Sequence, residues 1–96
     1  MAEYRFVIRG EIDLDTAPAL GVDLSDAAEN GSDSLVVDCG ALTFIDSTGI
    51  SVLVSICDAF RAQGRQFRVV NTNAITDRVL DILGVSEHLR GDPISR

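Results

Sequence analysis

The stretch Phe44-Ile45-Asp46-Ser47-Thr48-Gly49-Ile50 joins two apolar segments through a polar triplet that can form a turn. Upstream, Leu35-Val36-Val37-Asp38-Cys39 is rich in β-branched residues and bounded by Ser and Gly, which predicts a strand that feeds a loop. Downstream, apolar residues recur at intervals of three and four and predict one face of a helix: Ile50, Leu53, Val54, Cys57 and Phe60. Gly64 provides a stop signal. We therefore expect a helix that begins near Ser47.

Asp46 and Ser47 both favour the N-cap of a helix, because their side-chain oxygens can accept hydrogen bonds from unpaired N–H groups of the first turn. The simplest interpretation of Ser47 is such a cap. The alternative is a phosphorylation site, since a phosphoryl group there would meet free N–H donors and the positive end of the helix dipole. The chemistry of these residues alone leaves both interpretations open.

Alternating side chains predict two further strands. Residues 4–9 place Tyr, Phe and Ile on one side and Arg, Val and Arg on the other. Residues 66–70 repeat the scheme, with Phe67 and Val69 opposite Arg68 and Val70. A parallel sheet covered on both faces would show unbroken apolar runs instead, so we expect helices mainly on one face.

Two more helices complete the predicted order. The first has Asp15 or Thr16 as its cap and Pro18 in its first turn, and it ends at Asn30-Gly31. Its expected buried residues are Leu20, Leu24 and Ala27 or Ala28. The last helix starts at Thr72 or Asn73 and stops at Gly84, with Val85 in hydrophobic contact. Its expected buried residues are Ile75, Val79, Ile82 and Leu83.

This order predicts a small α/β domain, because right-handed crossovers give parallel strands with their helices on a common side. We expect three to four strands in a parallel β-α superhelix, forming a single domain over residues 1–96 with its core at about 4–89. Residues 90–96 are expected to form a frayed tail.

The composition narrows the function. Net charge is −7, which argues against nucleic acid as a partner. The charge is uneven, with −8 up to Asp46 and +1 from Ser47 onward, so the first half is either a solubilising surface or attractive to a basic partner. No apolar run approaches the roughly 20 residues of a membrane span, and the first residues do not resemble a signal peptide. We expect a cytoplasmic protein without membrane insertion.

The sequence contains few of the residue patterns that catalysis or cofactor binding requires. The chain has no Lys, which removes P-loop and Schiff-base mechanisms, and its single His88 lies near the C-terminus with no neighbouring apolar strand to position it as a base. Glu11, Asp13 and Asp15 precede a helix, where Asp is expected for capping anyway. Cys39 and Cys57 lack metal-type spacing and are expected to be buried apolar residues. We predict no enzyme activity, no metal and no cofactor.

Three motifs in order resemble the anti-sigma-factor antagonist family, also called STAS domains. The first is Gly10-Glu11-Ile12-Asp13, the second is Asp46-Ser47-Thr48-Gly49-Ile50 after Leu42-Thr43-Phe44-Ile45, and the third is Val79-Leu80-Asp81-Ile82-Leu83-Gly84-Val85. The likeness spans roughly residues 4–89 and agrees with the fold expected above.

The resemblance implies binding to an anti-sigma factor that is itself a serine kinase with an ATP-binding fold, which frees the sigma factor. Phosphorylation of Ser47, or less favourably of Thr48, would end that binding. The partner-binding residues carried over or placed beside the motif are Glu11, Asp13, Asp46, Ser47, Thr48, Gly49, Ser51 and Ser55. Two alternatives stay open: an accessory subunit of another assembly, such as a lipid-transporting ABC complex or a stress-signalling scaffold, and an adaptor without a switch.

The first predicted strand differs from the family pattern. Members commonly have an additional edge strand before it, whereas this chain starts almost at the equivalent of the second strand. We therefore expect an exposed sheet edge. Arg5 and Arg9 can block strand addition there, while an edge can also serve as the seam of a weak homodimer.

Overall fold

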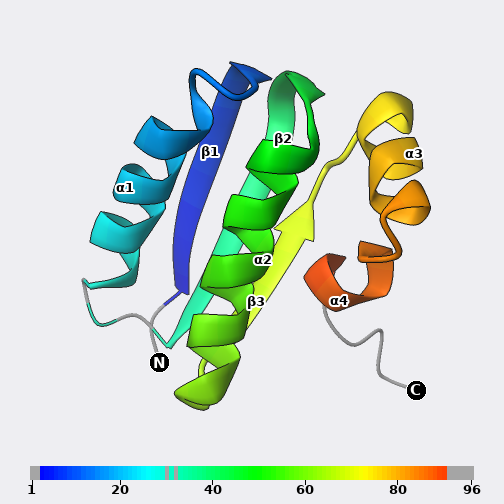
Figure 1. Ribbon diagram of the computed structural model, residues 1–96. Helices are drawn as coiled ribbons and strands as arrows, with labels where there is room; N and C mark the ends of the chain where they lie inside the picture. The colour runs from blue at the N-terminus through cyan, green and yellow to red at the C-terminus, as the bar shows by residue number, and fades with distance from the viewer. Residues whose placement is uncertain (1–2, 30, 32, 91–96) are drawn as a thin grey trace.

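Three parallel strands and four helices make up the computed structural model, which describes residues 3–29, 31 and 33–90. The elements are β1 (Glu3–Ile12), α1 (Ala17–Ala28), β2 (Ser34–Ile45), α2 (Ser47–Ala62), β3 (Gln66–Val70), α3 (Ala74–Ile82) and α4 (Ser86–Arg90). The sheet order is β1-β2-β3, and both neighbouring pairs are parallel (Figure 1). The predicted fold class is confirmed.

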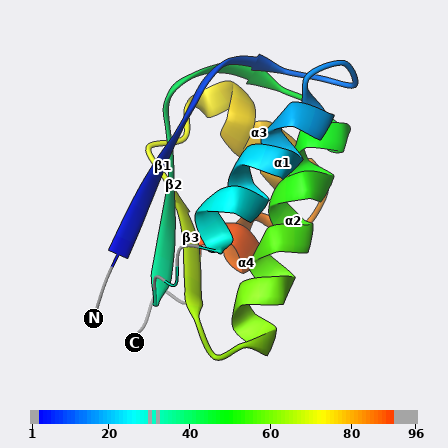
Figure 2. The same ribbon diagram turned by 90° about the vertical axis from the view of Figure 1, so that its left-hand side faces the viewer.

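The helices lie on one side of the sheet, as Figure 2 shows. The opposite face is formed by the strands alone in the described part of the chain. There Arg5 and Arg68 are in register on either side of Val36, whose exposed fraction is only 1%. Aliphatic stems of arginine can cover an apolar neighbour in this way. Arg5 also pairs with Asp38 at 3.0 Å. The prediction of a one-sided sheet is confirmed.

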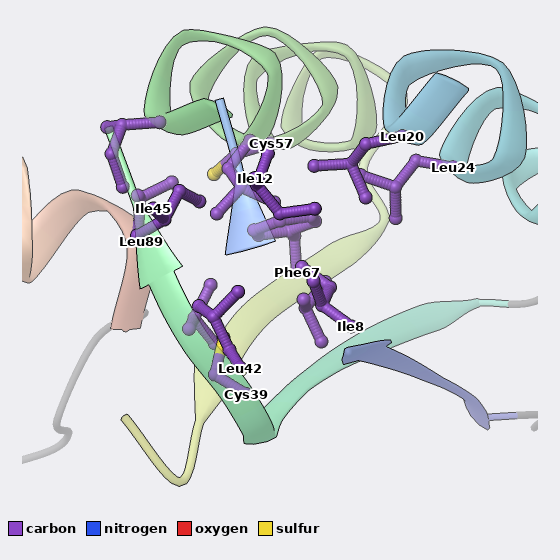
Figure 3. Packing of buried hydrophobic residues seen from close by; sticks show 14 of the residues in the cluster. Ile8, Ile12, Leu20, Leu24, Cys39, Leu42, Ile45, Cys57, Phe67 and Leu89 are labelled. Atoms are coloured by element: carbon purple, nitrogen blue, oxygen red, sulfur yellow. The ribbon is translucent and has the colours of Figure 1, made fainter. Parts of the chain in front are cut away.

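The core lies between the sheet and the helices. Side chains from β1, β2 and β3 converge with those of α1 and α2, and Leu89 closes the cluster from α4 (Figure 3). Phe67 and Val69 are buried while Arg68 is exposed, as the alternation predicts. Cys39 and Cys57 are free and buried, which confirms their interpretation as small core residues. Burial raises the pKa of the Cys39 thiol to about 11.

β2 is longer than predicted. The sequence favours a strand over residues 35–39 followed by a loop, but β2 continues to Ile45 and α2 follows after Asp46 alone. The second half of β2 pairs with the second half of β1, from Arg9 opposite Ala41 to Ile12 opposite Ile45. The register of β1 against β2 shifts twice, between Val7 and Arg9 and between Gly10 and Glu11. These shifts interrupt the regular alternation, which is why the pattern resembles a loop.

The last helix buries a different face from the one expected. Thr76 and Leu80 are its buried residues, whereas Ile75 and Ile82 have exposed fractions of 58% and 75%. The chain then turns at Gly84 and forms α4, which the sequence did not predict as a helix. Because Leu89 fills the core from α4, α3 packs through Leu80 and the partly buried Val79, while Ile75, Ile82 and Leu83 remain exposed.

The start of α1 also differs in detail. Thr16 occupies the N-cap position, one of the two predicted, but its side chain makes no capping hydrogen bond. Instead, Oδ1 of Asp13 accepts from the backbone N–H groups of Asp15 and Thr16, at 3.0 and 3.1 Å. Leu20, Leu24 and Ala27 are buried as predicted. Asn30 and residues 91–96, including most of the expected tail, lie outside the described residues. No described helix is long and apolar enough to cross a membrane.

Candidate functional site: the start of α2

Asp46 is the N-cap of α2. Its extended backbone (φ −104°, ψ −173°) lets Oδ1 accept from the N–H groups of Thr48 at 3.0 Å and Gly49 at 3.3 Å. The Thr48 hydroxyl donates to the same oxygen. The hydrogen bond from the Thr48 hydroxyl is the largest cause that holds the pKa of Asp46 below its ordinary value of 3.8. Burial opposes it, and the Gly49 and Thr48 N–H groups lower the pKa further. Asp46 is therefore an ionised structural residue at neutral pH.

Ser47 is the first residue of α2 and is exposed. Within the described part of the chain its hydroxyl makes no hydrogen bond, so the structure assigns the cap to Asp46 and leaves Ser47 facing solvent. One expectation needs correction. A phosphoryl group on Ser47 would not find a set of free N–H donors, because Asp46 already occupies those of Thr48 and Gly49. It would instead lie beside a carboxylate.

Gly49 lets the start of α2 approach the strands closely. A Cβ at this position would lie 2.6 Å from Cγ2 of Ile12 and 2.6 Å from Cγ1 of Ile45, both buried. Gly49 is itself buried, so the motif residue predicted to contact a partner is a packing residue. The first four residues of the motif thus have separate roles: Asp46 caps the helix, Ser47 offers an exposed hydroxyl, Thr48 has a half-buried hydroxyl, and Gly49 packs against the strands.

The loop after β1 lies beside this helix start. Glu11 is in register with Phe44, and the backbone N–H of Asp46 donates to the carbonyl of Ile12 at 3.1 Å. The structure therefore brings Glu11 and Asp13 to the same end of the sheet as Ser47. Glu11 is exposed, whereas the half-buried Asp13 is engaged at the start of α1.

A row of exposed polar residues continues along α2 from Ser47. We call Ser47, Ser51, Ser55 and Asp58 the α2 ridge; all four are exposed at helical spacing. The Ser51 hydroxyl donates to the carbonyl of Ser47 at 2.9 Å.

Grooves flank the α2 ridge on both sides. One, of about 570 Å³, lies between α1 and α2 and is lined in part by Val22, Val52 and Ile56. The other, of about 510 Å³, is lined by Ile50, Val54, Leu83, Val85 and the α2 ridge. A polar ridge between two partly apolar grooves combines polar and apolar surface, as protein–protein interfaces commonly do.

One cluster was missed by the sequence analysis, because α4 was not predicted. Nε2 of His88 lies 2.7 Å from Oδ1 of Asp58, and its Nδ1 lies 3.2 Å from a guanidinium nitrogen of Arg61. Sγ of Cys57 belongs to the same group of candidate ligands, all within 4.8 Å. The positive charge of Arg61 on the imidazole opposes a bound cation. We therefore interpret the contacts of His88 with Asp58 and Arg61 as a structural link between α4 and α2.

Comparisons with known proteins agree with this geometry. The sequence model of the STAS domain matches residues 4–95. The chain is 31% identical to the anti-sigma-F factor antagonist RsfB of Mycobacterium tuberculosis over 83 residues, covering 86% of the chain and 67% of that protein. It is 34% identical to an anti-sigma-B factor antagonist of Bacillus subtilis over 80 residues, covering 83% and 72%.

A solved structure shows the same fold. The crystal structure of an anti-sigma factor antagonist from Mycobacterium paratuberculosis superposes with a TM-score of 0.80 at 28% identity, over 91% of this chain and 74% of that one. The resemblance inferred from the three motifs is confirmed: the chain belongs to the STAS domain family.

Proposed function

We propose that this chain is an anti-sigma factor antagonist that binds an anti-sigma factor and thereby releases a sigma factor. The relatives named as anti-sigma factor antagonists support this proposal at the level of the whole chain. The observation that carries it is the placement of Ser47, exposed on the first turn of α2 at the end of a surface ridge. Its role is regulatory binding and not catalysis.

The partner is an anti-sigma factor with serine kinase activity, and Ser47 is the residue that it phosphorylates. Thr48 is the weaker acceptor, because its hydroxyl is half-buried and donates to Asp46. A kinase needs its acceptor hydroxyl free and accessible, and Ser47 has that environment. The proposed binding face comprises the α2 ridge together with Glu11, Thr48 and the loop that Asp13 anchors. Cytoplasmic location follows from such a partner.

Phosphorylation would act through surface charge. A phosphoserine adds roughly −1.5 to −2 charges at neutral pH. At Ser47 that charge would lie beside Asp46, whose carboxylate already uses the nearby N–H donors. Because the site is exposed, the fold would persist. The complex would not, since burying this charge against a surface shaped for a hydroxyl is costly unless the partner supplies counter-charges.

The proposed binding face can be tested with a matched pair of variants. The anti-sigma factor is first isolated by affinity capture from the source organism, using the chain as bait, and its affinity is then measured by titration. Ser55→Arg on the α2 ridge is expected to weaken binding by at least about tenfold, or about 1.4 kcal/mol. The control is Gln66→Arg, an exposed neutral residue at the start of β3, which should leave the affinity unchanged. Equal affinities of wild type and Ser55→Arg for the anti-sigma factor would contradict the proposal that the α2 ridge forms the binding face.

A further inference from the structure

β1 forms one margin of the sheet, because among the described residues its backbone pairs with β2 alone (Figure 1). Such an edge offers unpaired N–H and C=O groups that can template another strand. Gly10 has a φ of +71°, which interrupts the extended conformation. The regular part of the edge is therefore residues 3–9, with Phe6 at its centre.

A groove of about 240 Å³ lies between β1 and α1. Its lining includes Phe6, Ile8, Ala19, Leu20 and Asp23. A strand added to β1 would direct every second side chain toward the helix side of the sheet, where this groove lies. Tyr4, with an exposed fraction of 39%, is the ring on this side of β1 that the core does not bury.

We propose that the edge of β1 pairs antiparallel with β1 of a second copy of this chain, with Phe6 of one copy opposite Phe6 of the other. A two-fold axis perpendicular to the sheet keeps helix-facing residues opposite helix-facing residues. In this register Tyr4 of each copy lies opposite Ile8 of the other, beside the groove. On the open face, Glu3 of each copy lies opposite Arg9 of the other, so two opposite-charge pairs form.

Charge favours this register over its neighbours. With Val7 at the centre, Arg5 would face Arg9 and Glu3 would face Glu11, and like charges directly opposite each other are destabilising. With Ile8 at the centre, the paired segment would include Gly10, whose positive φ interrupts the extended conformation. In that register Glu11 would lie opposite Arg5, which already forms an ion pair with Asp38 at 3.0 Å.

The two residues that the proposal pairs are available. Arg9 makes no ion pair within the described part of the chain. Glu3 has a loose, exposed contact with Arg68 at 3.7 Å. Because the paired edge is short, it buries less than the roughly 1,200 Å² typical of stable complexes. We expect a reversible dimer with a dissociation constant of about 0.1–1 mM.

Sedimentation equilibrium of the 96-residue chain from about 10 μM to 2 mM tests the proposal. Wild type should shift from monomer to dimer across this range. Arg9→Glu and Glu3→Arg should each raise the dissociation constant by about tenfold, because two attractive pairs become repulsive. The double variant Glu3→Arg/Arg9→Glu should restore it to within about threefold. Arg78→Glu, the same charge change at an exposed site on α3, is the matched control and should dimerise like wild type.

Three results would overturn the proposal: wild type that stays monomeric throughout, single variants that dimerise like wild type, or a double variant that is not rescued. Amide chemical shifts recorded over the same concentrations separate the edge from other surfaces. They should change over residues 3–9, and changes confined to α2 would place self-association elsewhere. Neither result depends on binding of an anti-sigma factor, so the two proposals fail independently.

Discussion

At position 49 the absence of a side chain lets α2 begin directly against the ends of β1 and β2. A Cβ would lie 2.6 Å from side-chain carbons of both Ile12 and Ile45, which are buried and β-branched and cannot easily move. We expect Gly49→Ala to destabilise the fold by about 2 kcal/mol in urea denaturation, as overpacking typically does.

Gly21→Ala is the control for that substitution. Gly21 lies within α1, and the nearest atom to its added Cβ would be Cγ1 of Val52 at 3.7 Å, an ordinary contact. Since Ala favours a helix over Gly, this variant should be neutral or up to about 1 kcal/mol more stable. Equal stability of the two variants would mean that Gly49 is not a packing requirement.

Asp46 gives a prediction about pH. Its folded pKa is below 3.8, so its ionised form stabilises the fold fully above that pH, and the contribution is lost as the pH falls through the folded pKa. Because the Thr48 hydroxyl is the largest cause, Thr48→Val should raise the Asp46 pKa toward 3.8. Carboxyl ¹³C NMR titration measures this directly. Thr43→Val, at an exposed threonine of β2, should leave the Asp46 pKa where it is in wild type, and an unchanged value in Thr48→Val would contradict the geometry.

At this scale the sequence predicted the helix start and both capping candidates. It could not choose between Asp46 and Ser47, because both residue types cap helices and only the backbone geometry decides which carboxylate or hydroxyl meets the N–H groups. The sequence also assigned Gly49 to the partner-binding surface. The periodicity of apolar side chains cannot show that a glycine is closely packed, because glycine has no side chain.

Among the elements, α3 and α4 differ most from expectation. The difference can be tested by truncating one aliphatic side chain in each of these helices. Leu89 of α4 is fully buried, while Ile82 of α3 has an exposed fraction of 75%. Leu89→Ala should cost about 3 kcal/mol of unfolding free energy. Ile82→Ala should change it by less than about 0.5 kcal/mol. Chemical denaturation with a two-state fit measures both, and similar losses would mean that α3 buries the face predicted from the sequence.

The reason for that error is general. Residues 75, 79, 82 and 83 have helical spacing, and periodicity alone identifies such a stripe as the buried one. A short following helix can take the core position instead, and α4, with 5 residues, is too short to show a period of its own. By contrast, α2 and β3 were predictable because each buries a single regular face.

For the whole molecule, the parallel order of the strands is what assembles the site. Parallel strands end at the same edge of the sheet, so the loop after β1 and the start of α2 meet there, joined by the hydrogen bond from Asp46 to Ile12. This juxtaposition follows from the parallel topology, which the sequence predicted. It could not predict the grooves beside the α2 ridge, because they depend on how α1 and the turn between α3 and α4 pack against α2.

Calorimetric titration of the isolated anti-sigma factor with four forms of the chain tests the central claim most directly. The forms are wild type, the chain phosphorylated on Ser47 and verified by peptide mass spectrometry, Ser47→Asp and Ser47→Ala. Wild type and Ser47→Ala should bind within about threefold of each other, because Asp46 and not Ser47 caps α2.

The phosphorylated form should bind more than about a hundredfold more weakly, equivalent to roughly 3 kcal/mol, and Ser47→Asp should be weakened by about tenfold or more. Circular dichroism should show the same fold in all four. Equal affinities throughout, or label on Thr48 in place of Ser47, would contradict the claim that the exposed hydroxyl at the start of α2 is the switch.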